Sequence, residues 1–469
     1  MIDLSHLRGK TIAVLGLGKS GLASVKALVN GGAIVWAWDD NAESRGQLEA
    51  FGLAPINLAE CDWTEPDMLV ISPGIPSTFP TPHPAAEKAR RAGKPIICDV
   101  ELLCTALPDV PSIAITGTNG KSTTTALTAH IQSNAGIKTQ AGGNLGNPAL
   151  GFDPAGPDDC FVLELSSYQL ELLHDASFDA CGLLNITPDH LDRHGGMDGY
   201  IGAKRRVFAR NKGPKWAVIS VDDDPCARMA VELAREGGRR VIEVSVHKPA
   251  PHGIYVENGW LIDDLSGAQA RIMDLVTVAH MPGVHNWQNI AFAYALCRAR
   301  GVVASKIIEG IMSFPGLAHR QERLGMADGV TFVNDSKATN AEATAKALSA
   351  YRDIYWILGG KPKEGGIDGL QAFYPQIKKA YLIGTAADAF AETLGDDLPW
   401  QKCETLDRAT AAAFLDAREG IASRAVDMPV VLLSPACASF DQFKSFEARG
   451  DAFRDLFNAL ANTAGQEKP

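Results

Sequence analysis

The sequence predicts an α/β protein of three domains, each built on a largely parallel sheet. Short apolar runs alternate with longer stretches of helical spacing along the whole chain, which is the pattern of β-α-β units. The 469 residues suffice for three domains of about 150 residues each. Prolines near residues 108 and 315 interrupt the alternation, so we expect domains at residues 1–108, 109–316 and 317–469.

The first domain is predicted to hold a Rossmann-like parallel sheet. Its apolar runs place strands at Thr11–Leu15, Ile34–Trp38, Met68–Ile71 and Ile96–Cys98. Between the first two runs, apolar residues at helical spacing predict a helix over Gly21–Asn30. A strand, a helix and a second strand in this order make one parallel crossover unit.

The second domain repeats the alternation and then changes character. A helix is predicted from about Ser122 to Asn134 and another over Asn286–Arg300, with strands at Ile113–Thr116, Phe161–Leu165, Cys181–Asn185 and Trp216–Ser220. From about residue 239 to 277 the candidate strands are short and separated by turns. This segment is predicted to form a small antiparallel patch.

The third domain returns to the α/β pattern, which predicts a second Rossmann-like sheet. The expected strands are Val330–Asn334, Ile354–Gly359, Ala380–Gly384 and Val430–Ser434, with helices between them.

The composition is that of a globular chain without a general affinity for nucleic acid. Lys and Arg number 44 against 55 Asp and Glu, and the formal charge of −11 opposes binding to phosphate backbones. Nine cysteines are scattered without a C-x-x-C pair, which favours reduced thiols over a disulfide or zinc framework. The N-terminal segment lacks a signal-peptide pattern, and no apolar run approaches the roughly 18 residues of a membrane helix. We therefore expect a cytoplasmic protein that does not insert into a membrane.

A glycine fingerprint follows the first predicted strand. Gly16-x-Gly18-x-x-Gly21 opens a helix, and Asp39 ends the next strand near the offset typical of a dinucleotide site. Glycines at these positions let backbone N–H groups approach a diphosphate at the helix N-terminus. The pattern favours a diphosphate ligand and leaves the nucleoside open, so an NAD-dependent dehydrogenase is one interpretation.

A second phosphate loop, TGTNGKST, lies between a strand and a helix at residues 116–123. A loop of this kind turns backbone N–H groups toward phosphates, with Lys121 at the terminal phosphates and the Ser122 hydroxyl facing Mg²⁺. The general P-loop has a glycine where this chain has Ile115. A turn capped by Ser122 would explain the glycines but not the lysine, so we predict a P-loop ATPase-type domain that binds ATP.

Single polar residues downstream of this loop carry weaker signals. Glu164 ends a buried strand, where a carboxylate beside a P-loop suits Mg²⁺. His190 follows another strand in the run NITPDHLDRH, and alone it is most simply a structural histidine. Lys204 is placed on a helix and by itself would be a solvated charge.

Three polar loops of the third domain follow predicted strands. They are residues 334–340 (NDSKATN), 359–363 (GGKPK) and 434–441 (SPACASFD). The C-terminal ends of parallel strands form the binding edge of an open α/β sheet. Lysines and hydroxyls gathered there would suit a small acidic substrate.

Taken together, these motifs resemble those of the Mur ligase family. The matching runs occur in order between Gly16 and Phe446, and they are TGTNGKST, LELSSYQLE, NITPDHLDRH, HNWQN, HRQE, NDSKATN and LLSPACASFDQF. The last two runs are typical of the glutamate-adding members, whereas TGTNGKST alone also occurs in folylpolyglutamate synthetases.

The resemblance implies an ATP-dependent ligase of peptidoglycan synthesis with three α/β domains. ATP would phosphorylate the carboxylate of UDP-N-acetylmuramoyl-L-alanine, and the amine of D-glutamate would attack the acyl phosphate to give the amide, ADP and phosphate. The resemblance also implies a monomer with small-molecule substrates only. A folylpolyglutamate synthetase-like ligase, an NAD-dependent dehydrogenase and a non-catalytic nucleotide sensor are the alternatives.

Residue roles follow from the same resemblance. The ATP-binding positions are Gly117, Thr118, Asn119, Gly120, Lys121, Ser122, Thr123, Asn286, Asn289, Arg320 and Asp335. Mg²⁺, with two ions expected, would be held by Ser122, Glu164, His190 and a carbamylated Lys204; the catalytic set is Lys121, Glu164, His190 and Lys204. The UDP-substrate would contact Gly16, Gly18, Ser20, Gly21, Asp39, Ser72 and Asn144. The D-glutamate pocket would comprise Lys337, Thr339, Lys363, Ser439 and Phe446.

Two positions depart from the family pattern. Asp40 and Asn41 stand where familiar members have a Thr-Arg pair near the uracil. The loop after the second strand of the third domain holds both Lys361 and Lys363 where one lysine is usual, and spacing selects Lys363.

Overall fold

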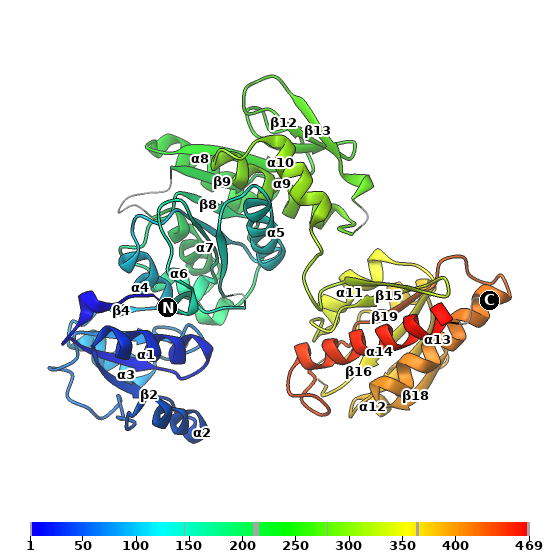
Figure 1. The fold of residues 1–469 in the computed structure, drawn as a ribbon, viewed down its shortest axis with the longest axis horizontal. Coiled ribbons are helices and arrows are strands. Elements are labelled where there is room, and N and C mark those ends of the chain that lie inside the picture. The colour runs from blue at the N-terminus through cyan, green and yellow to red at the C-terminus, as the bar shows by residue number, and fades with distance from the viewer. Residues whose placement is uncertain (1, 145, 210–214, 279, 363–364, 467–469) are drawn as a thin grey trace. The chain divides into compact units, whose positions relative to one another are not determined.

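The fold is α/β throughout and contains three sheets, as the sequence predicts. The computed structural model describes residues 2–144, 146–209, 215–278, 280–362 and 365–466. These residues form two compact units, one comprising residues 1–279 with 284–314 and the other residues 280–283 with 315–469. The first unit holds two sheets and the second unit holds the third sheet (Figure 1). The three-domain division remains a prediction.

The N-terminal sheet is parallel, with strand order β2-β1-β3-β4. Its predicted strands are confirmed, except that Cys98 lies outside β4 as the N-cap of the next helix. The last four of the five residues of β1 are buried. The elements of this part are η1 (Ser5–Leu7), β1 (Thr11–Leu15), α1 (Lys19–Gly31), β2 (Ile34–Trp38), α2 (Ala42–Gly46), η2 (Gln47–Phe51), β3 (Met68–Ile71), α3 (Pro84–Arg91), β4 (Ile96–Ile97) and α4 (Asp99–Ala106).

The central sheet has nine strands in the order β13-β12-β11-β10-β9-β8-β5-β7-β6. Its strands are β5 (Ser112–Thr116), β6 (Thr139–Gly143), β7 (Cys160–Glu164), β8 (Ala180–Leu183), β9 (Trp216–Ser220), β10 (Arg240–Ser245), β11 (Ile254–Glu257), β12 (Trp260–Asp263) and β13 (Ala270–Asp274). Its helices are α5 (Lys121–Asn134), η3 (Ala149–Gly151), α6 (Ser167–Glu171), η4 (Leu191–Arg193), α7 (Met197–Arg205), η5 (Arg206–Phe208), α8 (Asp224–Glu236), η6 (Leu275–Thr277), α9 (Val284–Ala299) and α10 (Ala304–Ser313).

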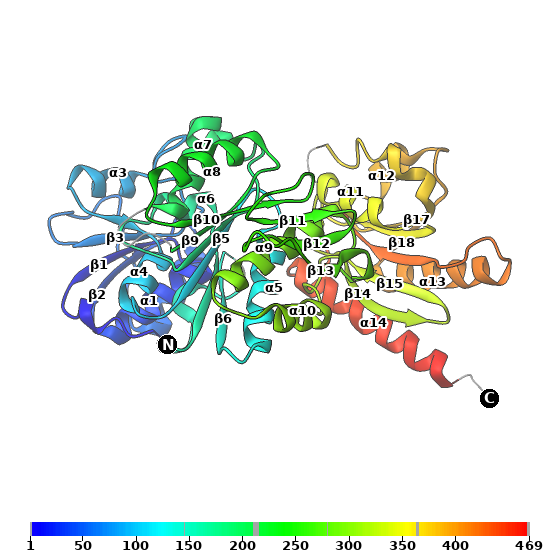
Figure 2. The ribbon, with the colours of Figure 1, turned by 90° about the horizontal axis from the view of Figure 1, so that it is seen from above.

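Helices cover both faces of this central sheet. Figure 2 shows α6, α7 and α8 on one face and α5, α9 and α10 on the other. The antiparallel patch is confirmed for β11, β12 and β13, but the expectation that it includes the run at β10 is wrong. Strand β10 pairs parallel with β9, because α8 forms a crossover between them that returns the chain in the same direction.

The sheet of the second unit has the order β14-β15-β19-β16-β17-β18, with β14 antiparallel to β15 and the other pairs parallel. Its elements are β14 (Glu322–Ala327), β15 (Val330–Asn334), α11 (Ala341–Ala350), β16 (Ile354–Gly359), η7 (Gln371–Gln376), β17 (Ile377–Ile383), α12 (Ala387–Leu394), β18 (Trp400–Glu404), α13 (Leu406–Ala422), β19 (Val430–Leu433) and α14 (Phe446–Gln466).

This third sheet carries a core on each face because alternate strand residues point to opposite sides. Val333 and Trp356 pack with α11 and α12, whereas Phe332 and Ile357 pack with α13 and α14. The same two helix pairs lie on opposite sides of the sheet in Figure 2. In the part of the chain that the structure describes, no helix combines the length and apolar character needed to cross a membrane.

Candidate active site

The glycine loop after β1 is held tightly by protein contacts. Gly16 has φ +91°, and a Cβ there would lie 2.6 Å from Ser72 Oγ. The Ser72 hydroxyl donates to the Gly16 carbonyl at 3.2 Å, and the Leu17 N–H donates to Asp39 Oδ2 at 2.7 Å. A Cβ at Gly18, the N-cap of α1, would meet nothing within 4 Å. The Asp39 and Ser72 side chains therefore fix the backbone of this loop, and there is open space beside Gly18.

Ser20 and Gly21, which are also predicted to contact the UDP-substrate, lie against other residues of the protein. A Cβ at Gly21 would lie 1.8 Å from the Gly16 carbonyl oxygen, so only glycine fits the turn. The Ser20 hydroxyl bonds to the buried carboxyl of Asp99 on α4. Burial raises the pKa of Asp99, against the opposing effect of hydrogen bonds from the backbone of Ala149 and from Ser20.

A polar cluster occupies the end of β2, where the sequence departs from the family pattern. Asp40 accepts a hydrogen bond from Trp38 Nε1 at 3.1 Å and faces His83 Nε2 at 3.2 Å. The Arg45 guanidinium donates to the carbonyls of Asp39 and Asp40 and lies 4.5 Å from the Trp38 ring centroid. Asn41 caps α2 by accepting the Glu43 N–H.

The phosphate loop between β5 and α5 adopts a conformation that its glycines permit. Gly117 has φ +156° and Gly120 has φ +83°, and a Cβ at Gly120 would lie 2.3 Å from Asn289 Oδ1. Asn185 Oδ1 accepts the N–H groups of Thr118 at 3.1 Å and Asn119 at 2.8 Å. The sequence reasoning gave Asn185 no role in the site. Asn185 lies two residues after the buried strand β8, at the start of the run NITPDHLDRH, and a polar side chain at that place was the available signal.

Two lysines converge on this loop. Lys121 Nζ donates to the carbonyls of Gly117 and Thr118 at 2.9 and 2.8 Å, and Lys204 Nζ donates to the Gly117 carbonyl at 2.8 Å. The interpretation of Lys204 alone as a solvated charge is wrong, because the residue is 1% exposed. Burial, followed by the nearby charge of Lys121, lowers the pKa of Lys204 to about 7. Burial therefore favours the uncharged form of this amine.

Glu164 lies at the C-terminal end of β7, directly beside the loop. In the sheet it is registered with Ile115 of β5 and with Gly143 of β6. Its Oε1 accepts a hydrogen bond from Asn144 Nδ2 at 2.8 Å, so the structure brings these two predicted residues together. Glu164 is 2% exposed, and its Oε2 has no hydrogen-bond partner among the described residues.

The orphaned oxygen of Glu164 fits a role as a Mg²⁺ ligand, because a buried carboxylate oxygen normally has a partner. Ser122 is the second residue of α5 and is 9% exposed. Among the described residues, no group of three or more His, Cys, Asp or Glu side chains could hold a metal ion by itself. Mg²⁺ typically keeps water and phosphate oxygens as ligands, so a complete protein cage is not required.

His190 is exposed and contacts the side chains of two neighbouring residues. It has φ +50°, its ring lies 5.3 Å from the Tyr168 ring, and its Nε2 lies 3.5 Å from Asp189 Oδ2. Buried His194 contacts Glu171 Oε1 at 2.7 Å and Ser167 Oγ at 2.9 Å through its two ring nitrogens. His194 is a second residue that sequence reasoning missed, and its contacts attach the His190 loop to α6.

Asn289 and Asn286 lie on α9 and approach the phosphate loop from its other side. Asn289 Oδ1 accepts a hydrogen bond from the Thr124 hydroxyl at 3.2 Å, and Asn289 Nδ2 donates to Asn286 Oδ1 at 3.2 Å. The structure thus brings these two predicted positions to the N-terminal half of α5.

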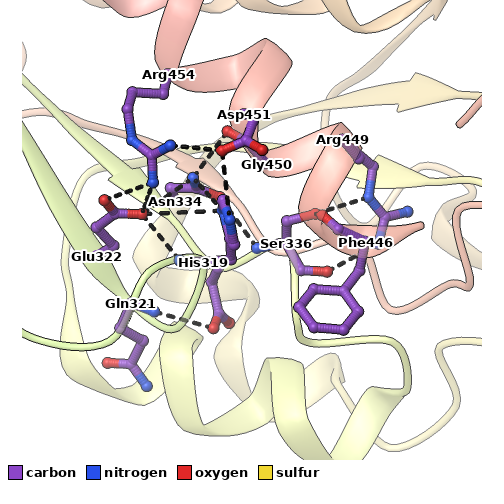
Figure 3. Close-up of polar contacts among 11 residues, drawn as sticks. His319, Gln321, Glu322, Asn334, Ser336, Phe446, Arg449, Gly450, Asp451 and Arg454 are labelled. Carbon is purple, nitrogen blue, oxygen red and sulfur yellow. Dashed lines mark hydrogen bonds and ion pairs between the residues drawn. The ribbon is translucent and has the colours of Figure 1, made fainter. Parts of the chain in front are cut away.

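In the second unit, the buried Arg449 side chain joins three strand-end loops, and Figure 3 shows its contacts with Ser336. Its guanidinium donates to Ser336 Oγ and the Ser336 carbonyl at 2.9 and 2.8 Å, to the Cys437 carbonyl at 3.1 Å and to the Gly359 carbonyl at 3.5 Å. Burial lowers the pKa of Arg449 to about 10. Arg449 was missed because the sequence around an arginine gives no sign that its side chain is buried.

Residues predicted for D-glutamate gather around these loops. Lys337 Nζ lies 5.6 Å from the Phe446 ring centroid, and the Phe446 carbonyl accepts the Ser336 hydroxyl at 2.8 Å. Ser439 is buried and Thr339 is half-buried on loops that Arg449 helps to join. Lys363 lies outside the described residues.

Arg320 and Asp335, predicted to bind the nucleotide, lie on adjacent loops of this unit. Arg320 is exposed. Asp335 is buried, and its two oxygens accept the Gln321 N–H at 3.1 Å and the Ser434 hydroxyl at 2.8 Å. Burial raises the pKa of Asp335 to about 7, although both hydrogen bonds oppose the shift. Its role toward a nucleotide stays a prediction.

Replacing Arg449 with methionine is expected to destabilise the second unit by about 2–4 kcal/mol, because several buried acceptors lose their donor. Hydrogen–deuterium exchange should rise in residues 334–340 and 434–440. Arg408→Met is the control, since Arg408 pairs with Glu404 on the surface. Unchanged exchange in the Arg449 variant would contradict the assignment of this side chain as the link between the loops.

The chain is similar to known proteins along its whole length. The Mur ligase middle domain matches residues 115–297, and the Mur ligase glutamate ligase domain matches residues 319–437. The chain is 48% identical over 478 residues to UDP-N-acetylmuramoylalanine–D-glutamate ligase of Rhodospirillum rubrum, with 100% of this chain and 98% of the relative covered. It is 49% identical over 460 residues to the protein of the same name from Paramagnetospirillum magneticum, with 98% and 99% covered.

A solved structure supports the fold. UDP-N-acetylmuramate–alanine ligase of Thermotoga maritima matches with a TM-score of 0.57 at 16% identity, covering 96% of this chain and 99% of that protein. The resemblance seen in the motifs is confirmed by matches that span the whole chain. The chain belongs to the Mur ligase family.

Proposed function

We propose that this chain joins D-glutamate to UDP-N-acetylmuramoyl-L-alanine, with ATP as the energy source, in peptidoglycan precursor synthesis. The observation that carries the proposal is the identity of nearly half of all residues, along the full length, to relatives that bear the name of this ligase. The phosphate loop and the strand-end loops of the second unit supply sites of the right chemistry for a nucleotide and an acidic amino acid.

The chemistry is a transfer between anions followed by attack of an amine. The γ-phosphoryl group of ATP passes to the carboxylate of the UDP-substrate, which gives ADP and an acyl phosphate. The amine of D-glutamate then attacks the acyl carbon, and phosphate leaves as the amide forms. Cations must offset the charge of the two reacting anions, and correct positioning supplies much of the rate. Lys121 and the N–H groups at the start of α5 are suited to this task.

Mg²⁺ is the cofactor in this proposal, and two ions are expected. Glu164 with its orphaned oxygen, Ser122, His190 and Lys204 are the residues that would hold it. When bound, the metal supplies positive charge to the phosphate oxygens and orients them. Lys204 would serve as a carbamate, because a buried amine with its pKa lowered to about 7 is partly uncharged and can react with CO₂. Carbon-13 NMR with labelled bicarbonate should then show a carbamate signal that is absent from Lys204→Arg.

The two substrates would bind at different loops. The loop of Gly16, Gly18 and Gly21, with Ser72, Ser20 and Asp39 beside it, would take the UDP diphosphate; Asn144 would contact the sugar end. Lys337, Thr339, Lys363, Ser439 and Phe446 would hold D-glutamate, with the two lysines facing its two carboxylates. The polar cluster of Trp38, Asp40, Arg45 and His83 stands near the expected uracil position.

The experiment that tests the proposal is phosphate release from ATP with UDP-N-acetylmuramoyl-L-alanine, adding amino acids one at a time. Release that depends strictly on D-glutamate is expected. If release requires another amino acid or a folate, membership of the ligase superfamily stands and the substrate assignment is overturned. No release with any acceptor, combined with tight NADH binding, would favour the dehydrogenase instead. The cytoplasmic location and the monomeric state remain predictions, and light scattering of the purified chain tests the second.

A further inference from the structure

An ion-pair network attaches the start of β14 to α14 in the second unit (Figure 3). Arg454 Nη2 donates to both carboxylate oxygens of Glu322, at 2.9 and 3.0 Å, while its Nη1 donates to Asp451 Oδ1 at 2.6 Å. The Glu322 side chain is only 17% exposed. The arginine therefore spans two carboxylates with separate nitrogens, a geometry that fixes the direction of the Glu322 side chain.

Glu322 in turn holds the preceding loop and the end of β15. Its Oε2 accepts the backbone N–H of His319 at 2.8 Å and lies 3.3 Å from Asn334 Nδ2. Asn334 is fully buried, and Nδ2 also reaches His319 Nδ1 at 3.1 Å and the Gly450 carbonyl at 3.0 Å. Asn334 Nδ2 can only donate, so its contact with His319 uses Nδ1 as the acceptor, while His319 Nε2 lies 3.5 Å from Asp451 Oδ1.

The backbone on either side of Arg320 is held in an unfavourable conformation by these contacts. His319 has φ +63° and Gln321 has φ +45°, a region that non-glycine residues seldom adopt. The His319 carbonyl accepts the Lys337 N–H at 2.9 Å, and the Gln321 N–H donates to Asp335 Oδ1 at 3.1 Å. Such backbone persists only where the surroundings over-determine it. The position of Arg320 therefore depends on contacts made by its neighbours.

We propose that Glu322 and Arg454 are positioning residues that hold the His319–Gln321 turn, and with it the exposed Arg320, in the conformation that binds the nucleotide. The inference rests on the proposed function for the nucleotide role of Arg320. Neither Glu322 nor Arg454 is part of the predicted substrate or metal sets. A partly exposed ion pair contributes little to the free energy of unfolding. The role of the Glu322–Arg454 pair is therefore to fix the conformation of the turn rather than to stabilise the whole unit.

The test uses the full-length chain and measures Kd for Mg·ATP by calorimetry, KM for ATP and for D-glutamate, and the melting temperature. Arg454→Met is expected to raise Kd and KM for ATP about tenfold, as loss of one well-positioned charged contact does. Arg454→Lys should recover part of this loss, because a lysine keeps the charge but not the two-pronged geometry. Glu322→Gln is the milder variant, since it keeps an acceptor for the His319 N–H.

Arg418→Met is the matched control, because Arg418 forms an ion pair with Asp328 at 3.2 Å elsewhere in the same unit. It should change the melting temperature by a similar amount and leave ATP affinity unchanged. If the Kd values of Arg454→Met and Glu322→Gln for Mg·ATP both lie within twofold of the wild-type value, the ion pair has only a structural role and the proposal is overturned.

A double variant decides whether Arg454 acts through Arg320. Arg320→Ala combined with Arg454→Met should bind ATP no more weakly than Arg320→Ala alone, whereas multiplied effects would overturn the proposal. If Arg320→Ala itself leaves ATP affinity unchanged, the nucleotide role of Arg320 fails and the inference falls with it. A wild type that binds ATP without D-glutamate-dependent phosphate release would refute the proposed function alone, since the binding experiments still test the positioning role.

Discussion

Lys121→Ala is expected to lower the rate of D-glutamate-dependent phosphate release by about a hundredfold or more. The lysine stands at the phosphate loop, where its Nζ makes hydrogen bonds to the carbonyls of Gly117 and Thr118. In the transition state its charge would be drawn to the transferring phosphoryl group, and loss of such a preorganised cation costs several kcal/mol. The loss should appear in kcat more than in the KM for UDP-substrate, because that substrate is expected to bind at the separate glycine loop of the N-terminal sheet.

The control for this variant is Lys138→Ala. Lys138 is an exposed lysine of the same unit, paired with Asp159 at 3.6 Å. It should retain the wild-type rate, which excludes a general effect of removing a lysine. Circular dichroism and the melting temperature establish that both variants fold. Near-wild-type turnover by a folded Lys121→Ala would overturn the assignment of residues 116–123 as the ATP phosphate loop.

Glu164→Gln is expected to produce the second large effect, a loss of about a hundredfold in turnover together with a higher Mg²⁺ requirement. Glutamine keeps an oxygen that can accept the hydrogen bond from Asn144, so the local fold should survive. It removes the negative charge at the oxygen that has no partner among the described residues. Carboxylate oxygens are the ligands that Mg²⁺ favours, and an amide is a weaker substitute.

The measurement is phosphate release against Mg²⁺ concentration for the variant and for Glu232→Gln. Glu232 is an exposed glutamate of the same unit, paired with Arg205 at 2.6 Å. The control should follow the wild-type Mg²⁺ curve, whereas the Glu164 variant should need several-fold more metal for half-maximal rate. An unchanged curve and an unchanged rate would show that Glu164 is a structural residue at a strand end.

The interior strands were predictable from the sequence, whereas three of the six edge strands were not. Runs such as Thr11–Leu15 and Ile354–Gly359 are apolar because neighbouring strands and helices cover them on all sides. The strands that sequence reasoning missed, β6, β14 and β18, each lie at an edge of a sheet. Edge strands are less covered, and Trp400–Glu404 accordingly has four exposed residues out of five. Their sequences carry too little apolar pattern to be recognised.

The conformations of the glycine-containing loops are local properties, so the sequence by itself determined them. The turns at Gly16 and Gly120, the position of Lys121 at a helix start, and the strand-end place of Glu164 all follow from short-range sequence order. The family could also be recognised from the ordered motifs, and the full-length comparisons confirm it.

Contacts between distant segments were decided only by the tertiary structure. Lys204 lies 87 residues from Gly117 in the chain, and only folding buries its amine against that carbonyl and lowers its pKa. Arg449 and Arg454 look like ordinary helix-surface arginines until α14 packs beside the loops of residues 334–340 and 319–322. Burial, pKa shifts and ion-pair partners depend on which segments meet in space, and a linear pattern of residue types does not contain that information.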